Sequence, residues 1–238
     1  MVARLFLLMT MAFSSLAAFC QHPAFRVIPL GIKGGQDESN LSAYLVAAED
    51  ASDYICLDAG TLHAGIRKAI ENGVLPPPVN AVLRHSIKDY FISHPHLDHV
   101  AGLILNSPED TNKNIYALPS CMRVLQNNYF TWQSWANFGD QGEKPQLGKY
   151  HYVALEPGAE ITAEHTTLAV RAFPLSHGNP YESTAFLVRN GDYSLLYLGD
   201  TGADTVERSD KLRQLWQTVS PLIRQGRLKA IFIEVSFP

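Results

Sequence analysis

Directly after the apolar residues 90–92, the chain places three histidines and one aspartate within six residues: His94, His96, Asp98 and His99. A short apolar run of this kind is typical of a buried strand, so the polar segment begins where a strand ends. Neutral imidazole nitrogens and carboxylate oxygens suit Zn²⁺, Mn²⁺ and Fe²⁺. In an extended segment His94 and His96 project to the same side, whereas Asp98 and His99 can turn toward a neighbouring ion. The spacing predicts two adjacent metal ions at a strand end, rather than a polar surface loop that happens to contain histidine.

Two later residues with metal-binding side chains also follow predicted strands and stand beside a glycine. His177 precedes Gly178, and Asp200 follows Gly199. An aspartate can bridge two cations because each carboxylate oxygen can bind one. Either residue alone has a structural alternative, since aspartate is a frequent turn former. Together with the first segment they extend the predicted site to six ligand candidates: His94, His96, Asp98, His99, His177 and Asp200.

The composition indicates a globular protein with a substantial core. Of its 238 residues, 46% are apolar and 18% are charged, so the chain is neither disordered nor a membrane bundle. The net charge of −4 offers no basic surface that would indicate a nucleic-acid polymer as partner. A small anionic substrate would need its charge neutralised locally, by metal.

Residues 1–20 have the pattern of a secretory signal peptide. Arg4 lies near the start, residues 5–13 are apolar, and residues 14–18 are mostly small, as peptidase cleavage requires. The apolar run is too short to cross a bilayer, and no later segment approaches the ~20 apolar residues that a span needs. A buried first element is the alternative, and a lipid-modified Cys20 is disfavoured because Phe19 stands where a small residue is expected. We expect export to the periplasm, with residues 21–238 forming the mature domain.

Two cysteines, Cys56 and Cys121, remain in the predicted mature domain. A disulfide would persist in an oxidising compartment. Cys56 lies within the apolar residues 54–57, however, and is expected to be a small buried hydrophobe. The sequence leaves their pairing open, and it also leaves open the oligomeric state, a homodimer included.

Strand patterns outnumber helical patterns, which predicts an α+β fold with helices on the outer faces of two packed sheets. Asn190-Gly191 between two apolar runs predicts a hairpin, because both residues tolerate positive φ. The proline-rich residues 76–78 predict a loop. Strands are expected at 25–30, 43–47, 54–57, 89–92, 114–117, 167–173, 184–188, 194–198 and 229–235. Helices are expected at 62–72, 100–105, 122–126 and 204–223.

The ligand motif continues as an apolar segment to Ser-Pro, and this longer pattern is similar to one family of the metallo-β-lactamase superfold. The stretch His94-Pro95-His96-Leu97-Asp98-His99-Val100-Ala101-Gly102-Leu103-Ile104-Leu105-Asn106-Ser107-Pro108 resembles the motif of the class II cyclic nucleotide phosphodiesterases. Gly34-Gly35, Leu57-Asp58-Ala59-Gly60-Thr61 and Ile233-Glu234-Val235-Ser236-Phe237 resemble other parts of that family. The resemblance implies an αββα four-layer sandwich for residues 21–238. It also implies a periplasmic enzyme that hydrolyses 3′,5′-cyclic AMP, with cyclic GMP as a second candidate, to the 5′-nucleotide.

The resemblance implies a role for each ligand. One ion would be held by three histidines, His94, His96 and His177. The other would be held by Asp98 and His99, with Asp200 as the bridge. The two divalent ions, Zn²⁺ first and Mn²⁺ or Fe²⁺ as alternatives, would supply a metal-bound hydroxide that attacks the cyclic phosphate. Asp98 and Asp200 are the predicted catalytic residues, and for Asp98 ligation ranks before proton transfer.

Other residues have weaker assignments. Asp58, Ser176 and Glu234 are candidates for holding the ligating imidazoles, which normally donate their second N–H to an oxygen. Asp58 could equally be a turn residue. The aromatic stretch 129–135 could stack on a purine base, although core packing is the stronger expectation.

One departure from the superfold concerns its final histidine, which is expected beyond Glu234, whereas this sequence stops at Pro238. We expect that the chain is a fragment lacking its C-terminal portion, and the alternative is an incomplete second metal position. Two other functions stay open. One is a different hydrolase on the same fold, acting on a lactone, thioester, sulfate ester or β-lactam. The other is a secreted metal-binding protein without turnover.

Overall fold

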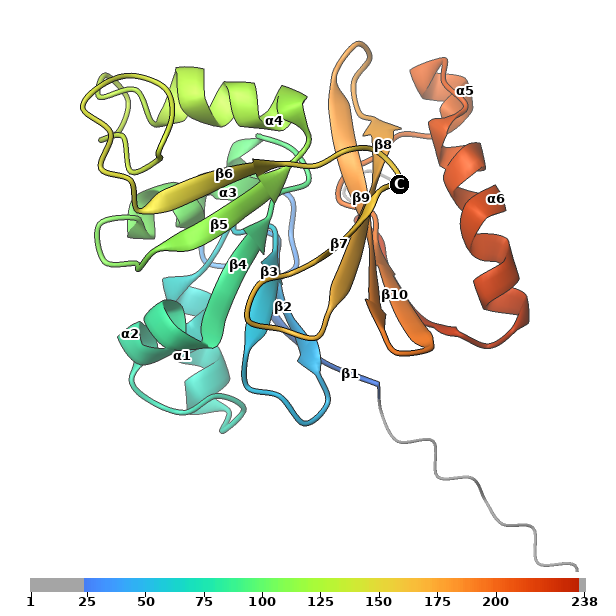
Figure 1. Ribbon diagram of the computed structural model, residues 1–238, viewed down its shortest axis with the longest axis horizontal. Helices are drawn as coiled ribbons and strands as arrows, with labels where there is room; N and C mark the ends of the chain where they lie inside the picture. The colour runs from blue at the N-terminus through green and yellow to red at the C-terminus, as the bar shows by residue number, and fades with distance from the viewer. Residues whose placement is uncertain (1–23, 236–238) are drawn as a thin grey trace, which may run out of the picture.

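The computed structural model describes residues 24–235, which form two β-sheets packed face to face (Figure 1). The first sheet has the order β1-β2-β3-β4-β5-β6, and its strands from β3 onward are parallel. The second sheet has the order β11-β10-β9-β8-β7, in which only β10 and β11 are parallel. The strands are β1 (Phe25–Gly31), β2 (Ala43–Ala48), β3 (Tyr54–Leu57), β4 (Ile87–Phe91), β5 (Lys113–Ala117), β6 (Tyr150–Ala154), β7 (Glu160–Thr162), β8 (Ala169–Ser176), β9 (Glu182–Asn190), β10 (Tyr193–Tyr197) and β11 (Leu228–Phe232).

Helices cover the outer side of each sheet and complete the expected α+β, four-layer αββα arrangement (Figure 1). The first sheet carries α1 (His63–Glu71), α2 (Val79–Ala81), α3 (Leu97–Asn106) and α4 (Pro119–Val124). Two π-helical turns, η1 (Val82–Ser86) and η2 (Leu125–Tyr129), continue α2 and α4. The second sheet carries α5 (Asp204–Glu207) and α6 (Lys211–Arg224).

Strand β3 shows why the layers form. Its four residues are all buried, and alternate side chains enter different cores. Tyr54 and Cys56 pack under the helices, whereas Ile55 and Leu57 pack between the two sheets. A third core joins α6 to the second sheet through Leu215, Val219 and their neighbours. A continuous apolar run is therefore required wherever a strand is covered on both faces.

The predicted hairpin is present, with one correction to its turn. Strands β9 and β10 pair antiparallel, and Asn190 pairs with Tyr193. The two turn residues are therefore Gly191 and Asp192, and Gly191 adopts the positive φ of 56°. Asn190 is the last residue of β9 instead of a turn residue.

The helix predicted at 204–223 is wrong as a single element. The structure contains α5 and α6, separated by Arg208 in the left-handed conformation (φ 51°). The carboxylate of Asp204 accepts hydrogen bonds from the backbone N–H groups of Leu212 and Arg213, at 3.1 and 2.8 Å. These are N–H groups of the first turn of α6, which otherwise lack partners, so Asp204 favours a new helix start.

Elements that the sequence analysis did not predict are short or irregular. They are the strands β6 and β7 and the helical segment formed by α2 and η1. Residues 1–23, including the expected signal peptide and Cys20, lie outside the described residues, as do residues 236–238. Cys56 and Cys121 are both free and buried, so they do not pair. Within residues 24–235 no helix has the length and apolarity to cross a membrane.

Asp89 of β4 is a carboxylate buried between the sheets, five residues before His94 in the sequence. Its Oδ1 accepts a hydrogen bond from the side chain of Asn114 (3.1 Å), whereas Oδ2 has no hydrogen-bond partner among the described residues. Burial raises the pKa of Asp89 to about 6. The folded protein therefore binds a proton on the Asp89 carboxyl more tightly than the unfolded chain does. The stability that this proton contributes is lost as pH rises through about 6.

We predict that Asp89→Asn stabilises the protein at about pH 8 relative to the unchanged chain, because it removes a buried charge. The free energy of unfolding of the variant, relative to that of the unchanged chain, should increase by about 2 kcal/mol between about pH 4.5 and about pH 8. Urea unfolding at both pH values measures it. A free-energy difference that does not change with pH would contradict the assignment.

Candidate metal centre

Segments at the C-terminal ends of three strands bring the six expected ligands to one place, and a fourth strand adds Glu234. The segment between β4 and α3 supplies His94 and His96, and the first turn of α3 supplies Asp98 and His99. His177 follows β8, Asp200 follows β10, and Glu234 follows β11. The site is therefore built from both sheets.

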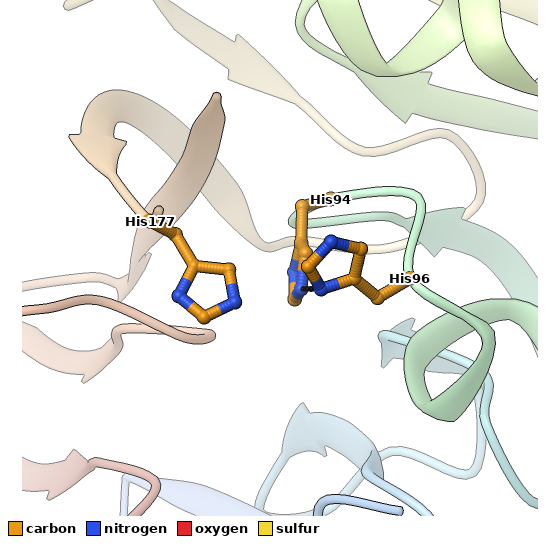
Figure 2. A group of neighbouring side chains, drawn as sticks. All are labelled: His94, His96 and His177. Carbon is orange, nitrogen blue, oxygen red and sulfur yellow. Dashed lines mark hydrogen bonds between the residues drawn. The ribbon is translucent and has the colours of Figure 1, made fainter. Parts of the chain in front are cut away.

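Three histidines form the first group. Their ligand nitrogens all lie within 4.8 Å of one another, and His94 Nε2 lies 3.0 Å from His96 Nδ1. Figure 2 shows the rings of His94, His96 and His177 directed toward a common point. Burial, and then the neighbouring His99, lower the pKa of His94 to about 2, and burial also lowers the pKa of His96. These two imidazoles are therefore neutral at ordinary pH, which is the form that binds metal.

A second group lies beside the first and consists of Asp98, His99, Asp200 and Glu234. His99 Nε2 lies 3.3 Å from Asp200 Oδ1, 3.7 Å from Asp98 Oδ2 and 3.7 Å from Glu234 Oε2. Both His99 Nε2 and Asp200 Oδ1 are buried, and neither forms a hydrogen bond with any described residue. Buried polar atoms without partners are costly, and a divalent cation would satisfy them together. Nitrogen and carboxylate ligands in this arrangement fit a metal ion.

Asp200 faces both groups with different oxygens. Its Oδ1 is the atom nearest to His99, whereas its Oδ2 lies 3.9 Å from His94 Nε2 and 3.6 Å from His177 Nε2. Burial alone would raise the pKa of this carboxyl, but His99 holds it well below its usual value. Asp200 is thus an ionised carboxylate in the position that a bridging ligand requires.

Asp58 is fully buried and orients histidines of both groups. It accepts hydrogen bonds from His99 Nδ1 (2.6 Å), from the Ser93 N–H and hydroxyl (both 2.7 Å) and from the Tyr197 hydroxyl (2.6 Å). The His99 bond places the imidazole with Nε2 toward the second group. The Ser93 hydroxyl donates its proton to Asp58, so His94 Nδ1 must donate to Ser93 Oγ (3.0 Å). His94 Nε2 then carries no proton and faces His96 of the first group. The orienting role expected for Asp58 is confirmed by these contacts.

The charge of Asp58 also acts on the protonation of His99. Burial by itself lowers the pKa of this histidine, but the carboxylates of Asp58 and Asp200 raise it well above its usual value. Without an ion, a proton on His99 partly balances the surrounding negative charge. A metal ion would take the place of that proton.

The backbone allows the loop after β3 to approach α3 closely. Asp58 itself adopts a positive φ of 54°, which aspartate tolerates better than most residues. A Cβ at Gly60 would overlap the carbonyl oxygen of Asp98, so only glycine fits there. Gly102 donates its N–H to the Gly60 carbonyl at 2.8 Å. This contact fixes the first turn of α3, which carries Asp98 and His99, against the loop of Asp58.

The site opens into a cleft of about 1180 Å³. Its walls include the loop of residues 34–38, the exposed His96 and Leu97, and residues 201–203 and Val206. The aromatic stretch 129–135 does not line this cleft. Phe130 is instead part of the core under the helices, and the Tyr129 hydroxyl donates to the Pro95 carbonyl at 2.9 Å. Core packing, the stronger expectation, is therefore correct for Phe130, against whose core Tyr129 and Trp135 also pack, whereas Trp132 is 42% exposed.

Three residues have roles that the sequence did not predict. Glu234, expected to hold an imidazole, lies among the possible ligands of the second group. Ser176 makes contacts at the site through its carbonyl oxygen, which accepts hydrogen bonds from Thr201 and Gly202. Ser93 was missed as the link between Asp58 and His94, although its place directly before the histidine motif was a signal that could have identified it.

The sequence profile of the class-II cAMP phosphodiesterases matches residues 79–238, which include all six ligands expected from the sequence. The chain belongs to the class-II cAMP phosphodiesterases. A relative, the 3′,5′-cyclic-nucleotide phosphodiesterase of Aliivibrio fischeri, is 41% identical over 239 aligned positions, which cover 94% of this chain and 72% of the relative. The probable 3′,5′-cyclic-nucleotide phosphodiesterase of Yersinia pestis is 39% identical, with 95% and 67% covered.

Solved structures show that this class-II member has the metallo-β-lactamase fold. Unliganded yeast PDE1 superposes with a TM-score of 0.78 at 21% identity, covering 88% of this chain and 74% of the yeast chain. The metallo-β-lactamase fold protein YhfI of Bacillus subtilis gives a TM-score of 0.53 at 18% identity, with 75% and 63% covered. The family and the fold that the motif predicted are both confirmed.

We predict that Asp58→Asn weakens metal binding by this class-II member about 10- to 100-fold, as is usual when a carboxylate behind a ligating histidine is changed. The shape is kept, but the amide carries N–H groups toward Ser93 and His99, which are themselves donors. Titration against a coloured chelator measures the affinity. Asp89→Asn is the matched control, because it also removes a buried carboxylate of the first sheet, and it should bind metal as the unchanged chain does. Equal affinities for both variants would contradict the role of Asp58.

Proposed function

We propose that this chain hydrolyses 3′,5′-cyclic AMP to 5′-AMP with two divalent metal ions, and that cyclic GMP is its second substrate. The observation that carries the proposal is the pair of adjacent ligand groups, joined by Asp200, in a member of the class-II family. Relatives with 41% and 39% identity carry the name 3′,5′-cyclic-nucleotide phosphodiesterase, in the second case as probable.

The chain's own residues hold and orient the reacting groups. In the proposed centre His94, His96 and His177 hold one ion, and the group around His99 holds the other. Ions bound there would lower the pKa of a water molecule to about 7 and offset the negative charge that develops on the phosphoryl oxygens. Asp200 fixes the distance between the two groups because each of its oxygens faces one of them.

Asp98 belongs to the second group and also faces the cleft. Its side chain is 22% exposed and lines the cleft, while Oδ2 approaches His99 Nε2. We assign it ligation first and proton transfer second, since a carboxylate bound to a metal is a poor acid. The cleft of about 1180 Å³ is at least as large as sites that enclose small organic ligands, so a nucleotide has room beside the metal ligands.

We propose zinc as the metal, with manganese and iron as alternatives. The first group offers three imidazole nitrogens, a ligand set typical of zinc hydrolases. The second group offers one imidazole and three carboxylates, which also suit manganese and iron. Elemental analysis of protein purified without added metal identifies the ion. Zinc is the expected result, with lower occupancy at the position of Asp98 and His99 than at the three-histidine group.

We predict that the purified chain converts cyclic AMP to 5′-AMP and that a chelator stops the reaction. His96→Ala should lower kcat/KM by at least about 100-fold, because a ligand of the first group is lost. His151→Ala is the matched control: this histidine is exposed, contacts Asp140 and lies outside the ligand groups. Separation of the product nucleotides by chromatography measures the rate.

Three results would contradict the proposal. The first is hydrolysis of cyclic AMP that neither chelation nor His96→Ala reduces. The second is turnover of a lactone, thioester, sulfate ester or β-lactam with none of cyclic AMP, which would favour another hydrolase on this fold. Two bound ions without any turnover would favour a metal-binding protein.

We also propose that the enzyme acts in the periplasm. The support is the order of a basic residue, an apolar run and small residues within 1–20. We predict that residues 1–24 fused to alkaline phosphatase give periplasmic phosphatase activity in a Gram-negative host. A fusion in which Leu7 and Leu8 are replaced by Arg should stay inactive, because the apolar run is broken. Equal activity of both fusions would contradict export by this segment.

A further inference from the structure

Glu207, the last residue of α5, is buried beside the loop that carries His177. Its Oε1 accepts a hydrogen bond from the Gly178 N–H, and its Oε2 accepts one from the Asn179 N–H, both at 3.0 Å. The Asn179 side chain donates a third bond to the Glu207 carbonyl, also at 3.0 Å. The two residues directly after His177 are therefore attached to one carboxylate.

The residue directly before His177 is attached to the same segment. The Ser176 carbonyl accepts hydrogen bonds from the Thr201 hydroxyl (3.1 Å) and from the Gly202 N–H (3.3 Å). Residues 201–207 follow Asp200 immediately in the chain. The backbone on both sides of His177 is thus bonded to the segment that begins at the bridging Asp200.

The path of the Glu207 side chain depends on Gly202. A Cβ at Gly202 would overlap Glu207 Oε1, so the carboxylate crosses the backbone where no side chain stands. Gly202 does not have a positive φ, and alanine is therefore acceptable to the backbone itself. This position offers a way to displace the carboxylate without removing it.

The ring of His177 lacks the support that His99 and His94 receive. Asp58 holds His99 directly and His94 through Ser93. No described residue forms a hydrogen bond with the His177 ring, whose nearest charged group is Asp200 Oδ2 at 3.6 Å. Its place at the first group must therefore be set through its backbone.

We propose that Glu207 is a positioning residue: by accepting the N–H groups of Gly178 and Asn179, it holds His177 at the three-histidine group and links it to Asp200. The inference rests on the proposed function, in which this group holds a metal ion. Binding of that ion would then depend on Glu207 as well, although Glu207 lies about thirty positions after His177 in the chain and does not contact the ion.

The test is Glu207→Gln in the full chain loaded with Co²⁺, whose visible absorption reports the geometry of its ligands. The amide keeps the size of the side chain, but only one of its two ends can accept an N–H. We expect about tenfold weaker binding of the ion at the three-histidine group and an altered absorption spectrum. Hydrogen exchange at Gly178 and Asn179 should be faster, while the far-UV circular dichroism stays unchanged.

Glu182→Gln is the matched control. Glu182 pairs with Lys211 at 2.8 Å and so also joins the second sheet to the outer helices. It makes no hydrogen bond to residues 176–179 through its side chain, within the described part of the chain. Co²⁺ affinity and spectrum should stay as in the unchanged chain. Glu207→Asp, which keeps both acceptor oxygens but shortens their reach, should restore part of the affinity.

A folded Glu207→Gln variant with native Co²⁺ affinity and spectrum would overturn this inference alone. If that variant does not fold, Gly202→Ala replaces it, and the same weaker binding is expected because the carboxylate is displaced. Native affinity in folded Gly202→Ala, with unchanged hydrogen exchange at Gly178, would again overturn the inference. Equal Co²⁺ binding by the unchanged chain and by His96→Ala would overturn the metal site itself, and the role of Glu207 with it.

Discussion

The carboxylate of Asp58 lies between the two sheets without exposure to solvent, and its negative charge is tolerated because donors surround it. Those donors come from three places: Ser93 after β4, His99 in α3 and Tyr197 at the end of β10. Each of them is thereby fixed relative to the others. The orientation of histidines in both ligand groups, and the position of the second sheet beside them, follow from satisfying this one charge.

Local patterns were enough to predict most of the fold. A strand covered on both faces, such as β3, leaves a continuous apolar run, and the hairpin between β9 and β10 leaves Gly191 at its turn. The division between α5 and α6 was not predictable in the same way. It depends on the Asp204 carboxylate, which accepts hydrogen bonds from N–H groups eight and nine residues later. An amphipathic pattern of side chains does not predict such a contact. Strand β7 has three residues, which is too few for alternation to be detected.

The ligand groups were predictable for a related reason. Four of the six expected ligands lie in one motif, and His177 and Asp200 each follow a strand. Glu234 was harder to assign because its role depends on a position beside His99, which sequence spacing does not give. Ser107-Pro108, at the end of the motif, differs from the ligands because its value for recognising the family does not come from a place at the metal site. It helped to identify the family, yet it lies at the far end of α3, where Ser107 accepts a hydrogen bond from Trp135 and Lys149 donates to its carbonyl.

The three histidines of the first group come from different layers of the fold, and this couples metal binding to folding. His94 and His96 belong to the first sheet, and His177 belongs to the second. An ion held by all three would act as a cross-link between the layers, and it would bind the assembled sandwich far better than the unfolded chain. Folding and metal uptake would then share one equilibrium. The amount of folded protein would follow the free metal concentration of its surroundings, so metal supply would set abundance as well as activity.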